Sequence, residues 1–307
     1  MRPPLNAARL AAPYVASAPY AALTAQRVGT PPAMSLAVSP ALLPTCAAGG
    51  NAVGLAVAAG AIAIGAQLLL VKLFRASGDR VLTATPGQLV HKLVALTFMV
   101  LAGGIGAAAW LHPALAGGSA GLLTVNATTR WLAAVLLGEL LLWDIPSAVW
   151  IPALRRKDML LHHVGMAVVA YLAVSAVPMA YGLFYLGFSE LSTIPLQVNE
   201  IYALAHKNAP DDDQRKPAFA KLRDVFQVAA AGAFVYVRGW SFTRVTVTKF
   251  LPDVVAYVSS TMPTLLPKGP LVAMLGLGVG FNALQLYWLW LLIAYMAKNG
   301  PGGERPE

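Results

Sequence analysis

The sequence contains seven apolar stretches, each long enough to cross a lipid bilayer as a helix. A transmembrane helix needs about 20 predominantly apolar residues, and the stretches cover residues 51–74, 90–111, 131–151, 159–178, 181–205, 225–249 and 270–296. Only 11% of the residues are charged, against about 25% in a soluble domain, and the mean hydropathy is +0.64. The sequence therefore predicts an all-α polytopic membrane protein with about seven transmembrane helices.

The remaining segments are tails and connectors. Residues 1–49 are rich in alanine and proline and contain no acidic residue, which is typical of a disordered tail or of an organellar transit peptide. Residues 50–87 are expected to form an extra N-terminal helix and loop, and residues 298–307 a short tail. The longest loop is the charged connector at 206–224, which is about twenty residues long.

The net charge of +9 raises nucleic acid as a partner, but the basic residues are scattered through short loops, and we expect no nucleic-acid binding. Apart from Arg238 and Arg244, fourteen of the Lys and Arg residues lie in or next to the odd-numbered gaps and the C-terminal tail, and six lie in or next to the even-numbered gaps and the N-terminal tail. The positive-inside rule then predicts a lumenal N-terminus and a cytosolic C-terminus. A plastid or mitochondrial membrane is the expected location if the tail is a transit peptide.

The fifth apolar stretch carries an unusual number of polar residues. Ionisable side chains inside a membrane are costly and usually face the interior of a helix bundle. At about 100° per residue, one face of a continuous helix would hold Glu190, Thr193, Gln197 and Glu200. Pro195 would bend this helix near its middle. The face predicts either an internal cavity or hydrogen bonds between helices.

The last two stretches offer partners for Glu190. Arg238 lies at a similar depth in the sixth stretch, Arg244 lies closer to the predicted lumenal end, and either guanidinium could reach the carboxylate. Asn282 and Gln285 are three residues apart on the seventh stretch, so they share a helix face and could extend the same polar network.

Two adjacent histidines open the fourth stretch. His162 and His163 point about 100° apart on a helix, so the pair alone cannot chelate a metal, and we expect none. Asp144, near the end of the third stretch, is expected to hold one of them in a single tautomer, which is the arrangement that general-base catalysis needs. The alternative is that both histidines anchor the helix at the membrane interface.

Together these motifs resemble the TLC domain, a family that includes ceramide synthases, translocating-chain-associating membrane proteins and TLC domain-containing proteins. The resemblance covers about residues 88–297. The family residues carried over by position are Trp143, Asp144, His162, His163, Ser189, Glu190, Pro195, Asn282 and Gln285. We assign the arginine of the family motif to Arg244 in "SFTRV", with Arg238 in "YVRGW" as the alternative. The resemblance implies a helical bundle around a central cavity that holds lipid, and the endoplasmic reticulum as the membrane in which it lies.

The stretch "YLGFSELSTIPLQVNEI" lacks the His-Asp and further aspartates of ceramide synthases. It is similar to the non-synthase branch, which implies a protein that binds or senses membrane lipids such as sphingolipids, fatty acyl chains or phospholipids. The sequence leaves a homodimer open, and no cofactor is expected.

Two other functions stay open. One is an acyl-CoA-dependent lipid N-acyltransferase of the ceramide-synthase type. Its base would be His162 or His163, and its acyl-CoA co-substrate would be attracted by the basic residues Arg155, Arg156 and Lys157. The other is a proton-coupled transporter that uses Glu190, an arginine and the histidines.

Overall fold

The computed structural model describes residues 51–112, 122–260 and 266–299, and this part of the chain is helical apart from loops and one isolated bridge. The tail predicted for residues 1–49 and residues 300–307 lie outside the described part. Five helical runs are long and apolar enough to span a membrane: Ala52–Ala76, Pro86–Leu111, Ala127–Trp150, Lys157–Ser175 and Lys268–Ala297. They confirm the prediction of an all-α polytopic fold.

The first spans follow the predicted stretches closely. Helix α1 (Ala52–Ala76) leads through the short α2 (Arg80–Ala84) to α3 (Pro86–Leu111). The third span is continuous but not uniform, because α4 (Ala127–Glu139) passes through a π segment, η3 (Leu140–Asp144), into α5 (Ile145–Trp150). A 3₁₀ turn, η4 (Pro152–Leu154), then connects α5 to α6 (Lys157–Ser175).

The prediction of a single bent helix over residues 181–205 is wrong. This stretch forms the short α7 (Tyr181–Tyr185), a 3₁₀ segment η5 (Phe188–Ser192) and α8 (Thr193–Asn208). The break falls at Gly187, where α3 packs backbone against backbone: a Cβ on Gly106 would lie 2.2 Å from the Gly187 Cα. Pro195 does not bend a helix either. It lies in the first turn of α8, where its missing N–H needs no intrahelical partner.

The sixth stretch belongs to a longer helical run than predicted. Helix α9 (Lys216–Ala233) continues through η6 (Phe234–Ser241), α10 (Phe242–Val245) and η7 (Thr246–Phe250) into α11 (Leu251–Ser259), and η6 and η7 are π segments. Both η3 and η7 end two residues before a proline. A proline ring clashes with the carbonyl four residues earlier, and a wider π turn relieves this clash.

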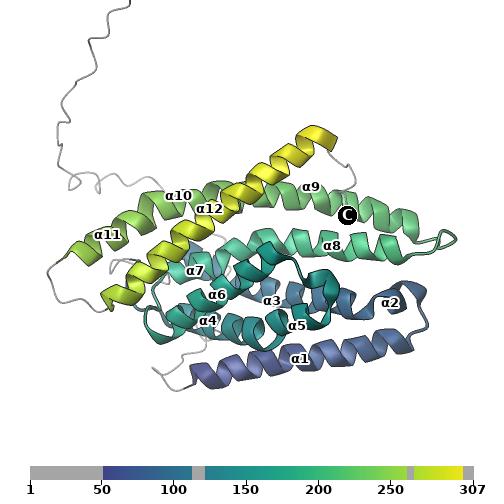
Figure 1. The fold of residues 1–307 in the computed structure, drawn as a ribbon, viewed down its shortest axis with the longest axis horizontal. Coiled ribbons are helices and arrows are strands. Elements are labelled where there is room, and N and C mark those ends of the chain that lie inside the picture. The colour runs from purple at the N-terminus through teal and green to yellow at the C-terminus, as the bar shows by residue number, and fades with distance from the viewer. Residues whose placement is uncertain (1–50, 113–121, 261–265, 300–307) are drawn as a thin grey trace, which may run out of the picture. The chain divides into compact units, whose positions relative to one another are not determined.

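The charged connector is shorter than the predicted 206–224. Helix α8 ends at Asn208 and α9 begins at Lys216, so both ends of the connector are helical and the two helices form a hairpin (Figure 1). Pro217 falls in the first turn of α9, a position that favours helix initiation. The loop that remains contacts the one after α1, since Arg215 Nη1 lies 2.6 Å from Asp79 Oδ2.

The loops lie at alternate ends of the bundle, as the connections between successive membrane spans must. The loop after α1 meets the α8–α9 loop through Asp79 and Arg215. The other ends of the helices meet through an isolated bridge between Val125 and Met179 and a bond of 2.6 Å from Asn126 N to Pro178 O. Gaps one and five therefore lie together, as do gaps two and four.

The last helix, α12 (Lys268–Asn299), crosses the α9–α11 run obliquely and also packs on α6 (Figure 1). On another side of the bundle, α1 packs on α4 at close range, with Gly138 facing the backbone of Ala56. The main apolar core includes Leu132 of α4 and Tyr181 and Phe184 of α7.

Candidate functional site

A cavity lies among α6, α7, the π-containing run from η6 to η7, and α12. The cavity volume is about 30 Å³. Pockets that hold drug-sized ligands are larger, about 300–1,000 Å³, so the walls must move apart to admit a larger ligand. Most of the wall is apolar and includes Met166, Val169, Met179, Phe250 and Met274.

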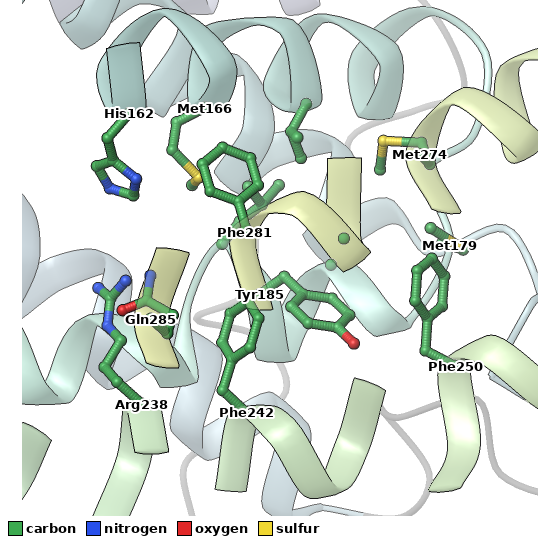
Figure 2. A pocket seen from close by; sticks show the side chains of 14 residues that line it. His162, Met166, Met179, Tyr185, Arg238, Phe242, Phe250, Met274, Phe281 and Gln285 are labelled. Carbon is green, nitrogen blue, oxygen red and sulfur yellow. The ribbon is translucent and has the colours of Figure 1, made fainter. Parts of the chain in front are cut away.

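The cavity has a polar end and an apolar end. Figure 2 shows His162, Arg238 and Gln285 together at one end, and Met179, Phe250 and Met274 at the other. His162 lies near the start of α6, so the polar end lies toward the turn between α5 and α6. A polar end joined to an apolar body suits an amphipathic molecule.

At the polar end, Arg238 is held by three side chains from η5 and α8, here called the Arg238 cluster. Its Nη2 lies 3.0 Å from Glu190 Oε1 and 3.0 Å from Thr193 Oγ1, and its Nε donates to Ser192 Oγ at 3.0 Å. Thr193 in turn donates to Glu190 Oε2 at 2.9 Å. Glu190 and Arg238 are both less than a tenth exposed, so the charges neutralise each other away from water.

Of the two candidate arginines, only Arg238 reaches Glu190, and the assignment of Arg244 to the cavity is wrong. Arg244 is exposed on α10, because the π segment before it changes the direction in which later side chains point. Asn282 is not a cavity residue either. Its Oδ1 accepts a hydrogen bond of 2.9 Å from Thr243 Oγ1, which joins α12 to α10.

The remaining candidates of the fifth stretch do not line the cavity, and each has different contacts. Ser189 of η5 is buried and donates to the Tyr185 carbonyl at the end of α7 at 2.8 Å. Gln197 lies on α8 outside the cavity wall, with its Oε1 buried and without a hydrogen-bond partner. Glu200 pairs with Lys92 of α3 at 2.5 Å. The predicted polar face therefore splits, and only its first part adjoins the cavity.

A second polar group, here called the Asp144 cluster, consists of Asp144, His91, His163 and Trp143. The Asp144 carboxylate contacts His163 Nδ1 through Oδ2 and His91 Nε2 through Oδ1 at 3.2 Å. The His91 ring stacks on Trp143 with centroids 4.5 Å apart. Because Asp144 is 6% exposed and His91 5% exposed, this cluster is a buried polar centre at the end of η3.

The two adjacent histidines have different surroundings. His163 contacts Asp144, whereas His162 lines the cavity and meets Phe281 and Trp288 of α12 edge-on, with each pair of ring centroids 5.3 Å apart. His162 Nδ1 is buried without a hydrogen-bond partner. The carboxylate and the cavity therefore engage different histidines.

The sequence model of the TLC domain matches residues 88–294. The chain belongs to the TLC-domain family. No curated protein and no solved structure matches the chain significantly. The family match covers both the Arg238 cluster and the Asp144 cluster, and all four segments that enclose the cavity.

The basic turn before α6, the fourth apolar stretch of the chain, makes contacts within the protein. Arg155 contacts the carbonyls of Ala148 and Val149 at the end of α5, and Arg156 pairs with Asp158 at 2.7 Å. Lys157 is exposed. Of the three residues considered for acyl-CoA phosphates, two therefore have protein contacts of their own.

Sequence reasoning missed two polar residues of the TLC domain, His91 and Ser192, and named Glu139 only as an ionisable residue of the third stretch. His91 lies in the second apolar stretch, where an ionisable residue is itself a signal, but nothing in the sequence shows that it faces Asp144. The contact between Ser192 and Arg238 could not be predicted, because only the 3₁₀ turn brings Ser192 to this arginine. Glu139 is 2% exposed, with Oε2 lacking a hydrogen-bond partner. Within the described residues, no group of three or more His, Cys, Asp or Glu side chains is arranged to hold a metal ion.

Proposed function

We propose that this TLC-domain protein binds the apolar chain of a membrane lipid in the cavity beside α12 and acts in membrane lipid homeostasis or trafficking. The observation that carries this proposal is the division of the cavity into an apolar body and a polar end formed by His162, Arg238 and Gln285. A chain that enters from the bilayer leaves hydrocarbon and not water, so its transfer gains no hydrophobic free energy, and selectivity would come from the shape of the wall and from the polar end. The polar end would fix the depth of the head group.

Two observations favour the non-synthase branch of the family. The stretch "YLGFSELSTIPLQVNEI" lacks the aspartates of ceramide synthases. In addition, Glu190 is occupied by Arg238 and Thr193, so it serves to hold the arginine in place. A fixed polar end of this kind suits recognition of a lipid.

The proposed setting follows the distribution of basic residues. We place the polar end on the side of the α5–α6 turn and infer that this side is cytosolic, with a lumenal N-terminus, in the endoplasmic reticulum. A plastid or mitochondrial membrane is the alternative if residues 1–49 are a transit peptide. The ligand would enter from the leaflet on that side.

A pair of adjacent residues on α6 provides the test. Val169 lines the cavity and is 7% exposed, whereas its neighbour Val168 faces outward and is 44% exposed. Val169→Phe should fill part of the cavity and reduce the lipid that co-purifies with the protein, measured by native mass spectrometry. Val168→Phe should leave that lipid unchanged. Equal lipid content in both variants and in the unaltered protein would contradict the proposal.

A second function, acyl-CoA-dependent N-acylation of a long-chain amine, is favoured by one contact. Asp144 orients His163, as a carboxylate does for a catalytic base, and His162 reaches the cavity. Purified protein given acyl-CoA and sphingoid base would then release free CoA, and His162→Ala or His163→Ala would abolish the release. Absence of CoA release across several acyl chain lengths would exclude this function.

A further inference from the structure

The polar end of the cavity is built for a particular kind of head group, and this inference rests on the lipid binding proposed above. We infer that the cavity selects a lipid whose head group is uncharged and both donates and accepts hydrogen bonds, such as a fatty amide or a monoacylglycerol. The amide of Gln285 and the charge balance around Arg238 set this requirement.

The side-chain amide of Gln285 is buried in the cavity wall without a hydrogen-bond partner. Its side chain is 1% exposed and lines the cavity, and neither its Oε1 nor its Nε2 has a hydrogen-bond partner. Leaving a buried amide unpaired costs about 1–3 kcal/mol for each group, and such groups in proteins almost always have partners. A head group that donates to Oε1 and accepts from Nε2 would satisfy both atoms.

The neighbours of Gln285 add to the same requirement. His162 Nδ1 is also buried without a partner, and Figure 2 shows this ring above Gln285 and Arg238 at the same end of the cavity. A neutral imidazole offers one donor and one acceptor. The polar end therefore presents both kinds of hydrogen-bonding group to a ligand.

The charge balance disfavours an ionic head group. Arg238 is the one Lys, Arg, Asp or Glu side chain among the lining residues, and Glu190 already neutralises it at 3.0 Å. A carboxylate or phosphate bound at this end would lose its hydration and find no unpaired positive charge. Such a transfer is costly in an apolar site. An ammonium group would lack a free carboxylate in the same way.

The head-group series that tests this inference uses the unaltered protein. A fluorescent fatty-acyl probe bound in nanodiscs would be displaced by palmitamide, monopalmitoylglycerol, palmitate or lysophosphatidylcholine, which share one chain and differ in the head group. We expect the two uncharged lipids to compete at least about tenfold better than the two charged ones, which corresponds to about 1.4 kcal/mol. Equal competition by all four, or stronger competition by palmitate, would overturn the inference and leave lipid binding intact. Failure of the probe to bind at all would instead remove the proposed function.

A variant pair assigns the preference to Gln285. Gln285→Met keeps the length of the side chain and removes both polar atoms, so the ratio between the competition by uncharged and by charged lipids should fall toward one. Gln197→Met is the matched control, because Gln197 also has a buried, unpartnered Oε1 but lies outside the cavity wall. It should keep the preference. A preference that persists in Gln285→Met would overturn the role of this residue. Because the head-group series needs no variant, the inference remains testable if a variant does not fold.

Discussion

Arg238 and Glu190 form an ion pair inside the helix bundle, with Nη2 and Oε1 3.0 Å apart and both residues less than a tenth exposed. The pair joins a π segment of the long helix to a 3₁₀ turn that lies more than forty residues earlier in the chain. Two ions removed from water depend on each other, because either one alone would be an uncompensated buried charge.

Breaking this pair from one side should therefore be costly. We expect Glu190→Gln to lower the free energy of unfolding by about 3–5 kcal/mol, measured by denaturant or thermal unfolding in detergent. The double variant with Arg238→Met should recover part of the loss, since no buried charge remains. Arg244→Gln, at an exposed position, is the control and should change stability by less than about 0.5 kcal/mol. A double variant less stable than Glu190→Gln would contradict the interpretation.

The break in the fifth stretch depends on contact between two glycines. A Cβ on Gly106 would lie 2.2 Å from the Gly187 Cα, whereas a Cβ on Gly104 would meet nothing within 4 Å. Gly106→Ala should destabilise the protein by about 1–3 kcal/mol through overpacking. Gly104→Ala on the same helix should be neutral or stabilising by up to about 1 kcal/mol, because alanine favours the helix. Similar thermal shifts in the two variants would argue against the close contact.

Asn282 is expected to act between helices and not as a ligand group. Thr243→Val and Asn282→Leu each remove one side of the 2.9 Å bond between α10 and α12. A double-mutant cycle of unfolding free energies should give a coupling of about 0.5–1.5 kcal/mol. Thr248→Val is the control, because this exposed hydroxyl bonds only to the Arg244 carbonyl in its own helix. Its pairing with Asn282→Leu should show no coupling.

The loop cluster at one end of the bundle predicts a defined pH dependence. Hydrogen bonds from Arg215 lower the pKa of Asp213 to about 2 and also lower the pKa of Asp79, against about 3.9 in an unfolded chain. The stabilisation is therefore present above about pH 4 and lost as the pH falls toward 2. The unfolding temperature of Arg215→Gln should lie below that of the unaltered protein at pH 6, and the two should converge below pH 4. Arg80→Gln, which removes an exposed contact of 4.0 Å to Asp212, should show no such convergence.

The contacts between loops predict which positions share a side of the membrane. In a Cys46→Ala background, single cysteines at the exposed positions Ala76 and Gln214 should react with a membrane-impermeant maleimide from the same side of sealed vesicles. A cysteine at Val125, which is 58% exposed, should react from the opposite side. The Cys46→Ala protein alone should not be labelled. Labelling of Ala76 and Gln214 from opposite sides would contradict the arrangement of the helices.

Much of the fold could be predicted from the sequence because the bilayer leaves few choices. Backbone groups in lipid must bond within their own segment, so long apolar stretches indicate helices, and five of the predicted stretches form such spans. The order of the polar motifs was enough to indicate the TLC domain. The presence of Asp144, His162, Glu190 and Gln285 inside the bundle also follows from the sequence, because buried ionisable and amide groups face protein.

The contacts within the site were decided by the tertiary structure. Helical spacing of 100° per residue holds only in an uninterrupted α-helix, and π segments and a 3₁₀ turn change the direction of every side chain that follows. These irregularities select Arg238 over Arg244 and bring Ser192 into the site. His91 joins Asp144 because α3 packs beside η3, a neighbour that periodicity along one chain cannot reveal. The sequence alone indicated most of the buried groups, and the packing of irregular helices determined which of them meet.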